Sequence, residues 1–210
     1  ITRISGSSLA SDAEHLWLAF EQKGITDIFE ISKGAAGAIR RIPVPGLLGP
    51  VQTLTKDVHR PNLWVGGDNT VFQLELPSGK LVSRTQTKGG RSRIFQIQPT
   101  EKKIYVGTDD GLLALSRNGQ QSEMNSILPA DEEKNRVMAI QNHDDTLFLG
   151  TNRGLVKYNL SHKTSQTVEN IFPSLSNKQE TGWFPGEVLS LAVGSRGVYL
   201  GGTQGRASFL

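Results

Sequence analysis

The sequence predicts an all-β fold in which one small sheet is repeated along the chain. A short apolar motif recurs five times. Every copy contains an aromatic residue, and a turn that usually contains glycine follows the motif. The marker residues are Trp17, Trp64, Tyr105, Phe148 and Tyr199, separated by 47, 41, 43 and 51 residues. An even division of the 210 residues gives 42 per copy. This period is typical of a β-propeller with about five four-stranded blades.

Each copy predicts four strands in a fixed order. The first three are apolar, because adjacent blades cover both faces of a sheet, and the second holds the aromatic residue, as in "LFLGTNRGLVKYNL" from Leu147. Glycine in the following turn permits a positive φ. The fourth strand is more polar, as in "KLVSRTQT" from Lys80, which suits the wet outer edge of a blade. The expected blades are 8–43, 51–87, 94–125, 136–170 and 188–210 together with 1–5.

The two ends of the sequence predict how the fifth blade is completed. The last copy ends after its third strand, and "ITRIS" at residues 1–5 is a β-type segment placed before the first copy. We expect residues 1–5 to supply the missing outer strand, which closes the ring and removes an exposed sheet edge. The chain then forms a single domain over 1–210. The alternative is that the five blades are part of a larger propeller in a longer chain.

Composition excludes several classes of protein. The chain has 36% hydrophobic and 20% charged residues, which is ordinary for a globular protein. Its 23 Lys and Arg against 20 Asp and Glu give +3, too even a balance to indicate nucleic acid or a membrane surface as partner. There is no cysteine for a disulfide, a thiolate metal site or a nucleophile. No apolar run approaches the length of about 18 residues that indicates a transmembrane helix.

The predicted inner strands argue against an enzyme. Propeller glycosidases need paired carboxylates near the channel axis, where the first strand of each blade lies. The five first strands, at 8–11, 51–54, 94–97, 137–140 and 188–193, contain no Asp or Glu. The histidines also lack metal-ligand spacing; they are His15, His59, His143 and His162. We therefore expect no catalytic residue, no metal and no cofactor.

The connections from each outer strand to the next inner strand are the expected place for a ligand. Together with the glycine turns, these connections line one mouth of a propeller channel. Their arginines can bind a carboxylate, sulfate or phosphate group of a ligand. The alternative is that they pair with loop acids such as Asp131, Glu132 and Glu133. Trp183 offers a stacking platform or, with Phe184, a small local core. Asp68, Asp109 and Gln204 would complete the rim. The candidate ligand-binding residues are Arg91, Arg93, Arg136, Asn152, Arg153, Trp183 and Glu187.

Several copies resemble a known repeat. "EVLSLAVGSRGVYLGGTQG", "IYVGTDDGLLAL" and "LFLGTNRGLVKY" are similar to the two-component regulator propeller repeat. "LWVGGDNTVFQLELPSGKLVSR" resembles quinoprotein-like repeats more weakly, and the first copy departs from the pattern with Ala19 in place of glycine. The main resemblance implies a periplasmic or extracellular propeller of a bacterial sensor, which recognises a ligand and signals to a kinase or cyclase elsewhere.

The expected function is therefore a non-enzymatic recognition module that senses a ligand or binds a partner. The expected partner is a small anionic or sugar-like ligand or another protein, with no nucleic acid and no insertion into a membrane. Two alternatives stay open: a carbohydrate-active or quinoprotein-type enzyme that uses loop residues, and a scaffold that docks another protein.

Overall fold

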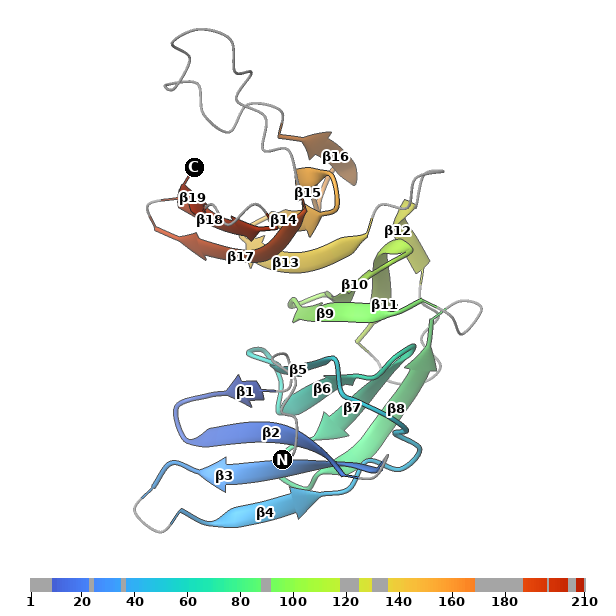
Figure 1. Ribbon diagram of the computed structural model, residues 1–210, viewed down its shortest axis with the longest axis vertical. Helices are drawn as coiled ribbons and strands as arrows, with labels where there is room; N and C mark the ends of the chain where they lie inside the picture. Colours follow the sequence, from blue (N-terminus) through green and yellow to red (C-terminus); the bar gives the residue numbers. More distant parts are fainter. Residues whose placement is uncertain are drawn as a thin grey trace, which may run out of the picture. The chain divides into compact units, whose positions relative to one another are not determined.

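The computed structural model describes residues 9–22, 25–34, 37–87, 92–117, 125–129, 136–168, 187–195, 197–203 and 207–209. All regular elements in these ranges are β-strands, arranged in five antiparallel sheets (Figure 1). Over the same ranges the chain forms no apolar helix of a length that could cross a bilayer. It divides into two compact units, residues 1–106 with 113–126, and 107–112 with 127–210. Each unit is described by itself.

The first unit contains two complete sheets and most of a third. In every sheet the strands pair in the order of the sequence. Residues 107–112 and 127–129 of the third sheet belong to the second unit. The strands of the first sheet are β1 (Leu9–Ser11), β2 (His15–Gln22), β3 (Ile25–Ser32) and β4 (Ile39–Ile42). Those of the second are β5 (Thr53–Lys56), β6 (Asn62–Gly66), β7 (Thr70–Glu75) and β8 (Lys80–Gln86). Those of the third are β9 (Ile94–Pro99), β10 (Lys103–Thr108), β11 (Gly111–Ser116) and β12 (Asn125–Pro129).

The second unit contains the fourth and fifth sheets. The strands of the fourth are β13 (Val137–His143), β14 (Thr146–Thr151), β15 (Gly154–Asn159) and β16 (Thr164–Thr167). Those of the fifth are β17 (Val188–Gly194), β18 (Gly197–Gly202) and β19 (Ala207–Phe209). Among the described residues the fifth sheet thus has three strands. The segment at residues 1–5, expected to add the fourth, lies outside the described residues, so ring closure stays a prediction.

The predicted strand order is confirmed in the sheets. Each repeat begins with a short inner strand, and the marker aromatics lie on the second strand: Trp17 on β2, Trp64 on β6, Tyr105 on β10, Phe148 on β14 and Tyr199 on β18. Inner strands of consecutive sheets lie side by side within each unit, β1 with β5 and β5 with β9 in the first, and β13 with β17 in the second.

Buried side chains fill the space between consecutive sheets. Trp17 and Ile28 of the first sheet pack with Leu63 and Leu74 of the second, all almost fully buried. A second cluster joins the second and third sheets; it consists of Trp64, Val71, Ile94, Ile97, Ile104, Val106, Leu113 and Leu115. The strands of the second sheet are apolar on both faces because this sheet packs between the first and the third, and each buried aliphatic side chain contributes about 1.5–3 kcal/mol.

The glycines of the "GTNRG" turn in the fourth sheet have two separate causes. Gly154 has a φ of 107°, which a residue with a Cβ rarely adopts. Gly150 instead lies against the next inner strand, where an added Cβ would come 2.7 Å from the carbonyl oxygen of Val188. Thr151 closes the turn, because its hydroxyl donates to the Gly154 carbonyl at 2.9 Å and accepts from the Arg153 amide at 3.1 Å.

Candidate recognition site

Among the described residues, the residue immediately before an inner strand is polar in the second to fifth repeats. These residues are Gln52 before β5, Arg93 before β9, Arg136 before β13 and Glu187 before β17. Backbone hydrogen bonds hold three of them against the end of the second strand or its turn: Gln52 N to Gly66 O at 2.8 Å, Asn152 N to Arg136 O at 3.3 Å, and Thr203 N to Glu187 O at 3.2 Å. Equivalent backbone positions therefore place these side chains at the same edge of their sheets.

In the first unit this position forms a chain of hydrogen bonds between the second and third sheets. Arg93 Nη2 donates to Gln52 Oε1 at 3.0 Å, and Gln52 Nε2 donates to Asp68 Oδ1 at 3.2 Å. The Arg93 guanidinium also lies over the ring of Phe95, 5.5 Å from its centroid. These contacts are exposed to solvent. They orient the guanidinium at the sheet edge without burying it.

In the second unit the same position brings together an arginine and a glutamate. Arg136 Nη1 lies 3.9 Å from Glu187 Oε1, and their side chains are 47% and 35% exposed. Asn152 fixes the backbone of Arg136, because its side-chain oxygen accepts from the Arg136 amide at 3.0 Å. An exposed ion pair of this length stabilises a protein by at most about 1 kcal/mol. Both charged groups can therefore turn to a ligand at little cost.

The candidate residues named from the sequence thus fall into three groups. Arg93 lies at the edge of the first unit, whereas Arg136, Asn152 and Glu187 meet in the second, with Arg153 in the adjoining turn. Arg91 and Trp183 lie outside the described residues, as do Phe184, Gln204 and the loop acids at 131–133. The pairing of Arg136 with Glu187 was not foreseen, although both residues were candidates.

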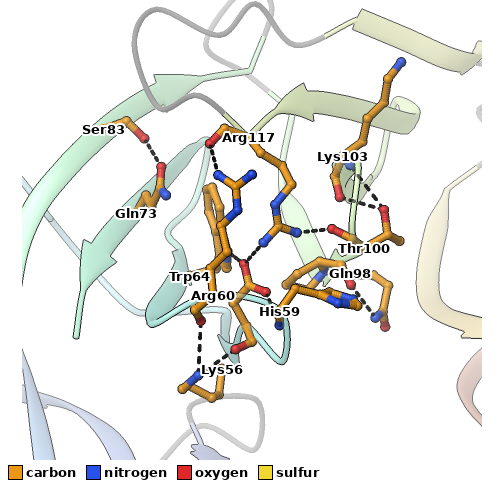
Figure 2. Close-up of polar contacts among 12 residues, drawn as sticks. Lys56, His59, Arg60, Trp64, Gln73, Ser83, Gln98, Thr100, Lys103 and Arg117 are labelled. Carbon is orange, nitrogen blue, oxygen red and sulfur yellow. Dashed lines mark hydrogen bonds and ion pairs between the residues drawn. The ribbon is translucent and has the colours of Figure 1, made fainter. Parts of the chain in front are cut away.

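Sequence reasoning missed a buried polar cluster at the other edge of the first unit. Asp57, fully buried in the turn after β5, accepts hydrogen bonds from Trp64 Nε1 at 3.1 Å and the His59 amide at 2.9 Å. Its carboxylate also forms an ion pair with Arg117, whose guanidinium donates as well to the Thr100 carbonyl. Figure 2 shows Trp64, Thr100 and Arg117 converging on this point. The cluster joins the second and third sheets.

The electrostatics of this cluster favour a charged Asp57. Burial alone would raise the pKa of Asp57, but the hydrogen bonds from Arg117, Trp64 and the His59 amide, with the Arg117 charge, outweigh it and hold that pKa below its usual value. A hint in the sequence was the Asp at the start of the turn, seven residues before Trp64. Nothing local marks Arg117 as its partner, since 60 residues separate the two.

Comparison with known proteins identifies the architecture. No family model and no curated protein matches this sequence. Among solved structures, the extracellular domain of BT4673 from B. thetaiotaomicron, described as a hybrid two component system, matches with a TM-score of 0.68 and 13% identity over 95% of this chain. The β-propeller domain of Cps50 (Swd1) from Myceliophteria thermophila matches with a TM-score of 0.67 and 14% identity over 96%. This chain has a β-propeller fold. The predicted fold class is confirmed.

The propeller neighbours extend beyond the part that this chain matches. The WD40 domain of Toxoplasma gondii coronin matches with a TM-score of 0.61 and 12% identity over 78% of this chain. The matched part makes up 26% of the BT4673 chain, 65% of the Cps50 chain and 46% of the coronin chain. At this level of sequence identity the likeness establishes the fold alone. The ligand and the partner have to be inferred from the residues of this chain.

Proposed function

We propose that this propeller is a non-enzymatic recognition module that binds a small anionic or sugar-like ligand at the Arg136 and Glu187 pair of the second unit, at the edge before the inner strands. The observation that carries the proposal is the repeated placement of polar side chains at this one position, where Gln52 contacts the Arg93 guanidinium in the first unit and Glu187 contacts that of Arg136 in the second. In propellers this edge surrounds a channel mouth, a common place for ligands.

The chemistry of the Arg136 and Glu187 pair defines the ligand class. A guanidinium binds a carboxylate or phosphate with two parallel hydrogen bonds, and a carboxylate accepts hydrogen bonds from hydroxyl groups. The two side chains lie 3.9 Å apart, so one ligand that carries an acidic group beside a hydroxyl can contact both. Acidic sugars have this arrangement. Arg153 and Trp183 remain candidate contacts of the same ligand, and Arg91 and Arg93 remain candidate ligand-binding residues of the first unit.

The inner strands support binding rather than catalysis. As observed, they contain hydroxyl, amide, aliphatic, lysine and histidine side chains, but the sequence places no Asp or Glu in them. The paired carboxylates of glycoside hydrolysis therefore cannot come from these strands. Asp57 is held by Arg117 in a buried ion pair, which supports a structural role for this carboxylate.

Two likenesses support a place in the extracytoplasmic part of a bacterial sensor. The repeats resemble those of two-component regulator propellers, and the fold is similar to the extracellular domain of BT4673. Both support a role in which ligand binding is passed to a signalling domain.

A thermal-shift screen tests the ligand class directly. The panel contains acidic and neutral oligosaccharides, nucleotides, quinone cofactors and divalent cations. A ligand present at 100 times its Kd stabilises the native state by about 2.7 kcal/mol, a readily visible shift in Tm. We expect acidic sugars to raise Tm, and Arg136→Gln to abolish that shift. The exposed Lys80→Gln is the control of equal charge change.

Two results would contradict the proposal. A screen without any hit among the anionic and sugar compounds would favour a scaffold that docks another protein. Release of reducing sugar from an oligosaccharide would favour the enzyme alternative. Calorimetric titration of any hit gives the Kd and separates true binding from nonspecific stabilisation.

A further inference from the structure

A group of cations lies at and beside the two turns at the far end of inner strands β5 and β9, away from Gln52 and Arg93. The half-buried Lys56 ends β5 and the exposed Arg60 lies in the β5–β6 turn, whereas the exposed Lys102 lies in the β9–β10 turn and the exposed Lys103 begins β10. Val58 stands beside the first two, with 81% of its surface exposed. We call these five residues the basic turn patch. It lies wholly within the first unit.

Buried contacts hold the two turns side by side. Thr55 Oγ1 donates to the Ile97 carbonyl at 3.0 Å, which joins β5 to β9 just before the turns. Arg117 then spans both turns, because it pairs with Asp57 of one and donates to the Thr100 carbonyl of the other. Arg60 Nη1 donates to the Arg117 carbonyl at 3.3 Å (Figure 2). The patch therefore rests on a fixed base.

One of the four cations of the patch has an acidic neighbour, since the charge of Lys56 helps to lower the pKa of Asp12. None of the four takes part in an ion pair among the residues that the structure describes, whereas Arg40 and Arg41 of the first sheet pair with Glu30 and Asp27. The buried Asp57 is already held by Arg117. With Arg117 the two turns carry five cations against Asp57 and Glu101, a net +3, equal to the formal net charge of the whole chain.

The side chains of Lys56 and Arg60 are already oriented by hydrogen bonds, and the backbone of the second turn is fixed. Lys56 Nζ donates to the carbonyls of Asp57 at 2.6 Å and Arg60 at 3.3 Å. The Thr100 hydroxyl fixes the second turn, as it donates to the Lys103 carbonyl at 2.9 Å and accepts from the Lys103 amide at 3.2 Å. A fixed side chain or turn loses less conformational entropy when a partner binds.

We propose that the basic turn patch binds an extended acidic segment of a partner protein. Carboxylates of that segment contact the lysines and Arg60, and an aliphatic side chain between them covers Val58. Nucleic acid fits less well, because proteins bind single strands with a positively charged groove and aromatic side chains on which the bases stack. This patch offers three exposed cations, the half-buried Lys56 and the aliphatic Val58. The site is separate from the ligand edge proposed above.

Fluorescence anisotropy with the full chain tests this proposal. The probe is a labelled peptide, Gly-Ser-Glu-Glu-Leu-Glu-Glu-Ser-Gly, and the matched peptide has Gln for every Glu. We expect binding of the Glu peptide only, and a Kd about two- to tenfold weaker for Lys102→Gln with Lys103→Gln. The control variant, Lys80→Gln with Lys163→Gln, removes the same charge from exposed positions outside the patch and should change the Kd less than twofold.

A further variant tests the apolar contact. Val58→Ser should weaken binding of the Glu peptide that contains Leu. Binding of a Glu peptide with Ser in place of Leu should not change. The proposal is overturned if the Gln peptide binds equally well, or if the control variant weakens binding as much as the patch variant. It is also overturned if a DNA oligonucleotide or anionic vesicles bind more tightly with the same dependence on Lys102 and Lys103. Circular dichroism confirms that each variant is folded.

Discussion

Replacing Arg117 by methionine isolates the contribution of the buried ion pair. Arg117→Met keeps the apolar stem and removes the charge, so the buried Asp57 keeps only the hydrogen bonds from Trp64 and the His59 amide. An unpaired buried carboxylate becomes protonated when that costs less than staying charged. With an unfolded pKa of about 3.9, protonation costs about 4 kcal/mol at pH 7 and about 1.5 kcal/mol at pH 5.

The variant should therefore lose about 3–5 kcal/mol of unfolding free energy at pH 7, with a loss roughly 2 kcal/mol smaller at pH 5. The stability of the wild type depends on pH in the opposite direction. The pKa of Asp57 is lowered in the folded wild type, so the contribution of Asp57 to the unfolding free energy is complete above the unfolded pKa. This contribution is lost as the pH falls through the folded pKa. Acidification from pH 7 to 5 thus narrows the difference between the two proteins.

Urea unfolding at the two pH values measures this effect, and tryptophan fluorescence is a suitable signal because Trp64 belongs to the cluster. Arg41→Met is the matched control. Arg41 pairs with Asp27 at 2.9 Å but is 61% exposed, so its loss should cost less than about 1 kcal/mol at either pH. A loss below 1 kcal/mol for Arg117→Met, or one that does not depend on pH, would refute the reasoning.

Three further predictions concern other parts of the chain. Gly150→Ala should lower the unfolding free energy by about 1–3 kcal/mol, because the new Cβ would lie 2.7 Å from the Val188 carbonyl oxygen. The control is Gly34→Ala, which should be nearly neutral in the same urea assay because no atom lies within 4 Å of its Cβ. Arg136→Ala should change Tm by less than about 3 °C, since its ion pair is exposed; a larger drop would make it a structural residue. Deletion of residues 1–5 should lower Tm if they complete the fifth sheet, and an unchanged Tm would contradict ring closure by this segment.

The sequence predicted the architecture well because the signal repeats. Trp17, Trp64 and Phe148 each sit in an apolar run at a regular interval, and burial of both faces of a sheet leaves little choice of residue type. A repeated pattern averages out local exceptions such as Ala19. Gly150 was assigned to its turn for the same reason, but its close approach to Val188 comes from the neighbouring sheet and has no local signature.

The polar contacts were harder to predict because they join distant parts of the chain. Asp57 and Arg117 lie 60 residues apart, and each resembles an ordinary turn residue when read alone. The position of Arg136 before an inner strand was visible in the sequence, but its contact with Glu187 depends on how two consecutive sheets pack. Spacing identifies equivalent positions, whereas the choice of partner requires the tertiary structure.

The two edges of the inner strands are stabilised in different ways, and this difference bears on function. In the first unit, one edge is fixed by the buried ion pair of Asp57 with Arg117 and by the three groups hydrogen-bonded to it, which are the Trp64 ring nitrogen, the His59 amide and the Thr100 carbonyl. The opposite edge is held by the exposed contacts of Arg93, Gln52 and Asp68. Exposed contacts contribute little to stability, so the residues there can change with small effects on folding. A recognition surface at that edge can therefore vary in specificity while the buried cluster keeps adjacent sheets in place.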